Sequence, residues 1–245
     1  MASLSGLFPG CLRPNFDRCR RLVLGLAVLL AINLAGAQQP AYLRKALDGF
    51  QTGVPAGWGY TLTTTRHERA VTERFNPARP PSAQWTLLET EGRAPTPDET
   101  EKYLRARATT PGGMQPNFER ADIEPGSLTL VREDDTHAEF AGSFRETSLG
   151  PDKMLGHLKL ILSVDKGTAH VSAYTLELKE PYSPVLGVKM TDLRVEARYS
   201  APAAGRPSLL TGITSRFAGR IFFIPTGEDL ELIYREHTAP NELSR

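Results

Sequence analysis

The sequence has almost no cysteine: its 245 residues include only Cys11 and Cys19. Both precede an apolar run at residues 22–37, so the chain that follows this run has no thiol chemistry and no disulfide to hold it together. Its stability must therefore come from a hydrophobic core. Residues 38–245 are enough for one domain with a substantial core.

An excess of charge of either sign is also missing. The chain has 29 basic and 28 acidic side chains, and the first 37 residues hold four arginines and one aspartate. The remainder therefore carries 25 basic and 27 acidic side chains. This balance gives no long-range attraction to nucleic acid, so we expect no nucleic-acid partner.

Motifs of metal binding and catalysis are absent as well. The five histidines lie far apart, and none has a second histidine or a cysteine at the spacing of a zinc site, so we expect neither a metal nor a cofactor. Ser163 and Lys166 match Ser-x-x-Lys, but this spacing works on a helix and here it crosses into a turn at Gly167. We therefore expect a protein that is not an enzyme. The alternative is a hydrolase whose site is assembled from distant residues.

The sequence has one long hydrophobic run, at residues 22–37. Four basic residues precede it: Arg13, Arg18, Arg20 and Arg21. The run ends in small residues at 35–37, and this combination is typical of a secretory signal peptide. It is shorter than the roughly 20 apolar residues of a spanning helix, although an uncleaved anchor is the alternative. We expect cleavage after Ala37 and a soluble periplasmic chain from Gln38 onward, with no transmembrane segment.

Two short helices are predicted in the chain after the run. Leu43, Ala46, Leu47 and Phe50 have the spacing of one apolar helical stripe, which predicts a helix at 42–50. Thr96-Pro97-Asp98-Glu99 forms a capping box, which predicts a helix inserted at about 96–107.

The rest of the chain is predicted as antiparallel strands joined mostly by short turns. They cover residues 60–66, 69–75, 84–89, 127–133, 136–145, 155–164, 169–179, 187–200, 209–224 and 230–237. Apolar residues alternate along them, which indicates a sheet that buries one face. The alternation slips near Thr191-Asp192, which predicts a β-bulge.

These patterns predict a mainly β fold with few helices. We expect residues 38–245 to form a single domain, a curved antiparallel sheet or unclosed β-barrel that is wrapped around or capped by the helices. The C-terminal tail, at about 239–245, is expected to be frayed.

The apolar face of this sheet is the predicted ligand site. It has two interpretations: a closed core, or the wall of a cavity for an acyl chain or other hydrophobic ligand. We place seven residues on that wall: Leu160, Leu162, Tyr174, Leu176, Phe217, Ile221 and Phe223.

Three stretches are similar to a group of uncharacterised periplasmic proteins of proteobacteria. They are Arg-Phe-Asn-Pro at 74–77 leading to Gln-Trp-Thr-Leu-Leu at 84–88, Gly-Arg-Ala-Pro-Thr-Pro-Asp-Glu at 92–99, and Pro-Tyr-Ser-Pro-Val-Leu-Gly-Val-Lys at 181–189. The order of signal peptide, short helix and long strands interrupted by a helix resembles the Lol-type lipoprotein carriers. That resemblance implies an unclosed β-barrel with helices as its lid and a hydrophobic cavity for acyl chains.

The sequence thus favours a periplasmic, non-enzymatic binding or carrier protein for a lipid-like ligand, with a lipid or an acylated protein as partner. An envelope scaffold that binds another protein along an exposed sheet edge is the main alternative.

Processing at Ala37 can be checked directly. The intact mass of the protein from the periplasmic fraction should lack residues 1–37, because the small residues before Gln38 fit a signal-peptidase site. A species in the inner membrane that retains residues 22–37 would contradict this prediction.

Overall fold

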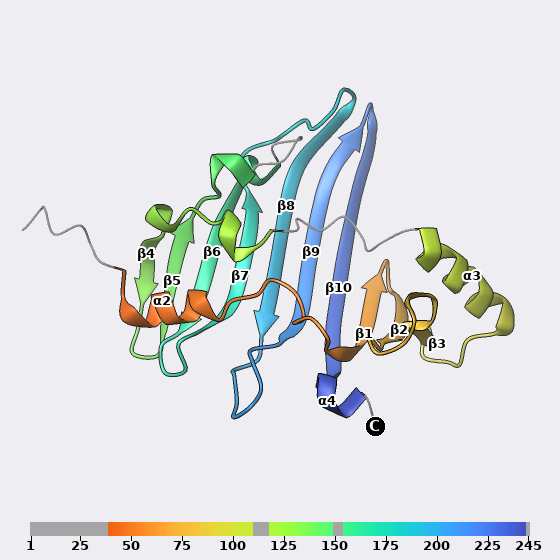
Figure 1. The fold of residues 1–245 in the computed structure, drawn as a ribbon. Helices are drawn as coiled ribbons and strands as arrows, with labels where there is room; N and C mark the ends of the chain where they lie inside the picture. Colours follow the sequence, from red (N-terminus) through yellow and green to blue (C-terminus); the bar gives the residue numbers. More distant parts are fainter. Residues whose placement is uncertain (1–38, 110–117, 149–153, 244–245) are drawn as a thin grey trace, which may run out of the picture. The chain divides into compact units, whose positions relative to one another are not determined.

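A ten-stranded antiparallel sheet organises the part of the chain that the structure describes (Figure 1). The structure is a computed structural model, and it describes residues 39–109, 118–148 and 154–243. The expected signal peptide, with Cys11, Cys19 and the cleavage site at Ala37, lies outside the described residues. The helices and strands lie within residues 41–245, which form one compact unit.

The strands follow the order β3-β2-β1-β10-β9-β8-β7-β6-β5-β4 across the sheet. Their bounds are β1 (Gly59–Arg66), β2 (Arg69–Phe75), β3 (Trp85–Thr90), β4 (Thr129–Glu133), β5 (His137–Gly142), β6 (Leu158–Asp165), β7 (His170–Leu178), β8 (Val188–Tyr199), β9 (Leu210–Ile221) and β10 (Ile224–Thr238). Because β3 and β4 are the two edges and do not pair with each other, the sheet is not closed into a barrel. The predicted fold class is confirmed.

Three α-helices accompany the sheet in the described residues: α2 (Ala41–Asp48), α3 (Pro97–Thr109) and α4 (Pro240–Leu243). Short 3₁₀ turns lie at Pro81–Ala83, Arg120–Asp122, Pro125–Ser127, Glu146–Ser148 and Met154–His157. The first two α-helices match the predicted ones within two residues at each end. None of the helices in the described part has both the length and the apolar character that a membrane crossing requires.

Helix α2 lies across one face of the sheet and contacts β7 (Figure 1). We call this face the inner face. Leu43, Ala46 and Leu47 of α2 are buried in the core, as the predicted stripe requires. Phe50 follows the helix and makes an edge contact with Tyr174, with ring centroids 6.2 Å apart. The helix therefore packs its apolar side chains against the inner face at β7.

Most of the core consists of inner-face side chains from the middle strands. They are Ala138 and Phe140 of β5; Leu158, Leu160, Leu162 and Val164 of β6; Val171, Tyr174 and Leu176 of β7; Leu193, Val195, Ala197 and Tyr199 of β8; and Leu210 and Ile213 of β9. Their alternation with more exposed residues matches the predicted one-sided burial, because successive side chains of a strand point to opposite faces.

Two local features of the sequence form as expected. The pairing of β8 with β9 shifts register between Met190 and Asp192, which is the predicted bulge. At the start of α3, the Glu99 amide donates to Thr96 Oγ1 at 3.3 Å and the Thr96 amide donates to Glu99 Oε2 at 2.8 Å. This reciprocal pair is the predicted capping box.

Several strand bounds differ from the prediction by one to three residues, and the start of β10 differs by six. The turn between β9 and β10 lies at Phe222 and Phe223, so β10 begins at Ile224 instead of about Leu230. Within the C-terminal tail, residues 240–243 form the short helix α4. This helix packs on the start of β1: a Cβ added at Gly59 would lie 3.1 Å from Leu243 Cδ2.

The contribution of α2 can be measured by truncating its buried side chains. Leu47→Ala and Phe50→Ala should each lower the free energy of unfolding by about 2–5 kcal/mol, because each leaves a cavity in the core. Lys45→Ala, on the exposed side of the same helix, should change it by less than about 0.5 kcal/mol. Urea denaturation of the three variants makes the comparison. Equal unfolding midpoints would show that α2 is not part of the core.

Candidate functional site

A pocket of about 1110 Å³ lies on the inner face, over β1, β10 and β9 and beside the segment at residues 52–58. Its apolar lining is formed by Val54, Trp58, Tyr60, Leu62, Phe75, Trp85, Tyr174, Leu210, Ile213, Leu230, Leu232 and Tyr234. Tyr174, Leu210 and Ile213 belong to the core as well, so the pocket continues the core surface past the end of α2.

The strand register brings the aromatic side chains of the pocket together. Tyr60 lies opposite Phe75 in the β1–β2 pair, and Phe75 lies opposite Trp85 in the β2–β3 pair. Directly opposed residues share a face of the sheet, so the three rings form one row. The ring centroids are 5.3 Å apart for Tyr60 and Phe75 and 4.8 Å apart for Phe75 and Trp85. Tyr234 of β10 joins the row, with its ring 5.4 Å from that of Tyr60.

Three tyrosine hydroxyls are among the polar groups of this lining, which also includes the side chains of Thr52, Thr64, Arg66, Gln84 and Arg107. Tyr60, Tyr174 and Tyr234 all line the pocket, and their hydroxyls make no hydrogen bond to another described residue. Burial raises the pKa of all three, to about 12 for Tyr174. They are therefore neutral at ordinary pH and are available to donate or accept hydrogen bonds within the pocket.

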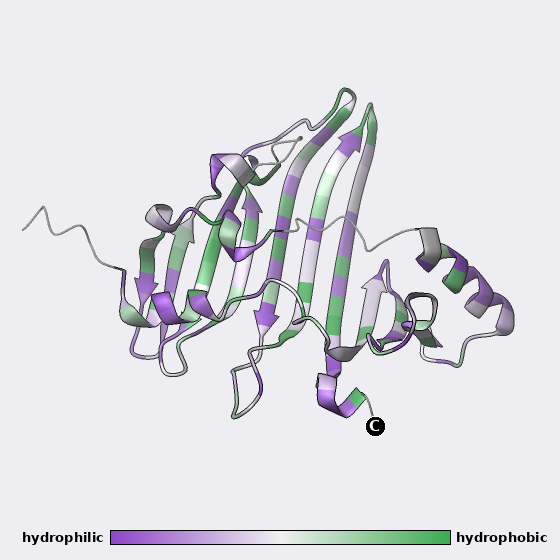
Figure 2. Cartoon of the chain, in the orientation of Figure 1, coloured by the Kyte–Doolittle hydropathy of each residue, from purple (hydrophilic) through white to green (hydrophobic). Residues whose placement is uncertain are grey.

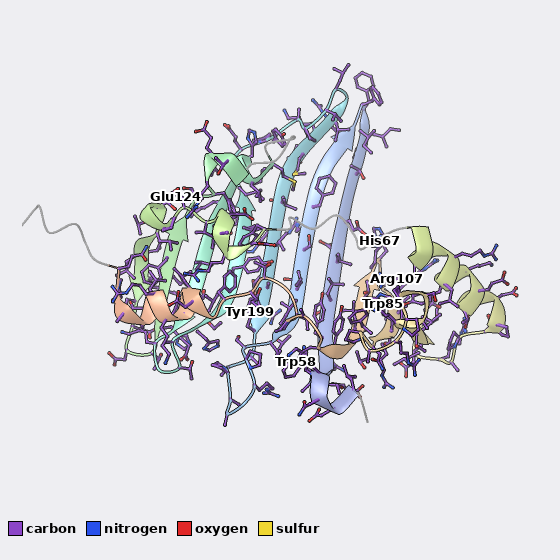
Figure 3. The ribbon with its side chains drawn as sticks, in the orientation of Figure 1. Trp58, His67, Trp85, Arg107, Glu124 and Tyr199 are labelled. Atoms are coloured by element: carbon purple, nitrogen blue, oxygen red, sulfur yellow. The ribbon has the colours of Figure 1, made fainter. Side chains whose placement is uncertain are left out.

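A buried ion pair forms the end of the pocket near β3. Glu73 of β2 is only 2% exposed, and Arg107 of α3 forms a salt bridge with its carboxylate. Arg107 Nε lies 3.2 Å from Glu73 Oε2, and the Tyr103 hydroxyl donates to the same oxygen at 2.5 Å. The Arg107 guanidinium also lies 4.2 Å from the centre of the Trp85 ring (Figure 3).

This ion pair attaches α3 to the sheet without leaving a net charge in the pocket. Burial lowers the pKa of Arg107 and raises that of Tyr103. Glu73 occupies an inner-face position between Leu62 and Leu87 of the neighbouring strands, where a lone carboxylate would be costly. The pocket wall therefore combines apolar and aromatic side chains with neutral polar groups and two paired arginines, Arg107 with Glu73 and Arg66 with Glu228.

The seven residues predicted to bind a ligand are not brought together. Tyr174 lines the pocket, whereas Leu160, Leu162 and Leu176 are fully buried in the core among the middle strands. Phe217 packs against the core from the far half of β9, and Ile221 is 47% exposed. The expectation that Phe223 faces inward from a strand is wrong, because it lies in the turn after β9 and is 94% exposed.

The residues that sequence analysis missed come from the first three strands and from α3. Tyr60, Phe75 and Trp85 each lie at or next to the end of a strand. The predicted strands at 60–66 and 69–75 already imply that Tyr60 lies opposite Phe75, but they do not show that this row of rings lines a pocket. Tyr234 shares the inner face with Leu230 and Leu232, since residues two apart on a strand point the same way. No local signal marks Glu73 as the partner of Arg107, because the two lie 34 residues apart, with β3 and its flanking loops between them.

A second pocket, of about 740 Å³, lies on the opposite, outer face of the sheet. Charged and hydroxyl side chains dominate its lining, including Arg194, Arg216, Asp229 and Glu231. Arg194 forms a salt bridge with Glu177, and Arg216 lies 3.7 Å from Asp192. Its two arginines are thus paired within an exposed sheet surface, so the inner-face pocket is the better candidate site.

The described residues show no arrangement for metal or Ser-Lys chemistry. They contain no group of three or more His, Cys, Asp or Glu side chains that could hold a metal ion. Lys166 is not directed at Ser163: its Nζ lies 2.8 Å from both Glu133 Oε1 and the Asp134 carbonyl oxygen. Asp165 Oδ1 accepts the Thr168 amide at 2.8 Å, which makes this stretch a hairpin turn.

Comparison with known proteins adds no assignment. No family model matches the chain, and neither the curated proteins nor the solved structures contain a match.

The buried ion pair leads to a stability prediction. Glu73→Ala should lower the free energy of unfolding by about 3–5 kcal/mol, because it leaves Arg107 partly buried without its counter-charge. Glu101→Ala removes the exposed Glu101–Arg105 pair on α3 and should lower the free energy of unfolding by less than about 1 kcal/mol. Chemical denaturation of both variants compares the contributions of the buried and the exposed ion pair to stability. A small effect of Glu73→Ala would mean that α3 does not depend on this contact.

Proposed function

We propose that this protein is an exported binding or carrier protein that holds a lipid-like ligand in the inner-face pocket. The pocket itself carries the proposal. Binding sites for small molecules are concave, mostly apolar, and of about 300–1000 Å³, with a few convergent polar groups. The inner-face pocket has about this volume, an aromatic and aliphatic lining, and three neutral tyrosine hydroxyls.

The polar part of the ligand is expected to be uncharged. Both cations that line the pocket are already paired, Arg107 with Glu73 and Arg66 with Glu228, so a phosphate or free carboxylate would find no unpaired positive charge there. Tyrosine hydroxyls instead suit an ester, hydroxyl or amide group. An acyl ester, from a lipid or an acylated protein, combines such a group with a long apolar chain.

Export is the second part of the proposal. It is supported by the basic residues and the apolar run of the first 37 residues and by the absence of cysteine after them. A soluble chain with an apolar pocket would give a hydrophobic ligand a route through an aqueous compartment such as the periplasm.

The edge strand β4 supports a second candidate function, that of an envelope scaffold. All five residues of β4 are exposed, and Leu130 and Val131 are apolar. Its outer side pairs with no other strand of the sheet, so an extended segment of another protein could add to it.

Uptake of the neutral fluorescent probe Nile red tests the binding proposal. The unmodified protein should give a saturable rise in fluorescence, and Leu232→Glu should weaken binding at least about tenfold, because an apolar ligand would desolvate the new carboxylate. Ile233→Glu is the matched control: it places the same charge on the next residue of β10, which faces the other side of the sheet. We expect it to bind the probe like the unmodified protein.

A second variant separates loss of binding from loss of fold. Thr64→Trp fills pocket volume without adding a charge, and it should also weaken probe binding while circular dichroism stays unchanged. The proposal would be refuted if the unmodified protein showed no saturable binding, or if both pocket variants bound the probe as tightly as the unmodified protein. Lipid extracted from the purified protein and analysed by mass spectrometry would identify the natural ligand.

A further inference from the structure

A cluster of exposed apolar side chains lies at the far end of the longest hairpin, away from the pocket. It combines the β9–β10 turn with the loop that leads into β8, and Figure 2 shows the hydrophobic colouring of these strand ends. We call it the apolar tip; its members are Val185, Leu186, Ile221, Phe222, Phe223 and Ile224. Leu186 is 99% exposed and Phe223 is 94% exposed. Soluble proteins rarely leave such a cluster in water without a partner.

The two loops of the apolar tip are held together as one unit. The Phe222 amide donates a hydrogen bond to the Gly187 carbonyl oxygen at 2.5 Å. The Phe222 ring occupies the space where a side chain at Gly187 would lie, since a Cβ there would come within 2.7 Å of Phe222 Cε1. Gly187 also has a φ of +83°, which only glycine adopts easily. The apolar side chains are therefore presented from a fixed support.

The backbone of the turn holds an aromatic residue in a conformation that such residues rarely adopt. Ile221 pairs with Ile224, so Phe222 and Phe223 form a two-residue hairpin turn. Phe222 has a φ of +54°, and such positions in tight hairpins favour glycine, asparagine or aspartate. A bulky side chain in this conformation is strained, and strain of this kind concentrates at functional sites.

Two positive charges lie directly behind the apolar tip. Lys189 of β8 lies opposite Arg220 of β9, and neither forms an ion pair with any described residue. Like charges directly opposite each other destabilise a sheet. The first charges beyond them on these two strands, Asp192 and Arg216, lie 3.7 Å apart and compensate each other. The apolar tip is thus followed by an uncompensated basic pair.

We propose that the apolar tip docks the protein on an anionic lipid bilayer. The exposed phenylalanines and leucine enter the boundary between head groups and acyl chains, and Lys189 and Arg220 meet the phosphates of the lipid. Apolar side chains with adjacent basic residues are the combination that binds peripheral proteins to anionic membranes. A projecting turn enters a soft bilayer without a matching surface, whereas a protein partner would need a preformed hollow. The proposal does not depend on what occupies the pocket.

Vesicle sedimentation tests this docking. The full chain, as processed by the expressing cell, is mixed with vesicles of phosphatidylcholine or of phosphatidylcholine with phosphatidylglycerol. We expect it to sediment with the anionic vesicles and to be released as salt rises. Leu186→Ser with Phe223→Ser should lower the partition coefficient by about tenfold or more, since each change removes a large apolar side chain from the interface.

Two sets of variants make the result specific. Leu130→Ser with Val131→Ser removes two apolar, exposed side chains from β4, far from the apolar tip, and should leave sedimentation unchanged. Lys189→Gln with Arg220→Gln should reduce binding to the anionic vesicles and abolish its salt dependence. All variants share one N-terminus, so a contribution from the first 37 residues would be the same in each.

Insertion of the tip itself has a local readout. In Phe223→Trp, the added tryptophan emission should shift to shorter wavelength on mixing with anionic vesicles, as the indole leaves water. An unshifted emission, or equal sedimentation of the Leu186→Ser, Phe223→Ser variant and the unmodified protein, would overturn the proposal. So would a concentration-dependent dimer that this variant abolishes, because the apolar tip would then bind a second copy of the chain.

Discussion

The pairing of β1 with β10 is the contact on which the inner-face pocket depends. It joins residues 59–66 to residues 230–238 and thereby attaches the first three strands to the end of the meander that runs from β4 to β10. The pocket lies over this junction, with Leu62 and Tyr234 on directly opposed positions. Because the contact joins distant parts of the chain, its formation carries a large entropic cost of loop closure. The pocket therefore forms only when the last strand is in place.

The two halves of the inner face differ in how their apolar side chains are covered. Over the middle strands, α2 supplies Leu43 and Leu47, and the surface closes into a core. Over β1 and β10 no helix covers the sheet among the described residues, and aromatic rings line an open space. Helix α3 reaches this half only through Tyr103 and Arg107, whose contacts with Glu73 hold a polar helix on an apolar strand face. The sheet thus offers a packed half and an accessible half.

Sequence patterns predicted the elements well because they are local. The alternation in β6 and β7, the stripe of α2 and the capping box at Thr96 each depend on neighbouring residues. The bulge near Thr191 was predictable for the same reason, since an inserted residue changes the parity of the apolar positions. The candidate site was not predictable, because alternation assigns a face and not a position on it. Leu160 and Tyr174 share a face, yet only Tyr174 extends into the pocket.

The turn at Phe222 sets a limit on how stable the longest hairpin can become. Replacing a non-glycine residue at positive φ by glycine or asparagine is a common way to stabilise a protein, and such changes often reduce function where strain serves it. Natural proteins stay close to the stability that their function requires, so a strained aromatic turn persists only where its loss is disadvantageous. Selection for thermal stability alone would be expected to remove Phe222 early. The hairpin would then gain robustness and lose the ring that fixes the neighbouring loop at Gly187.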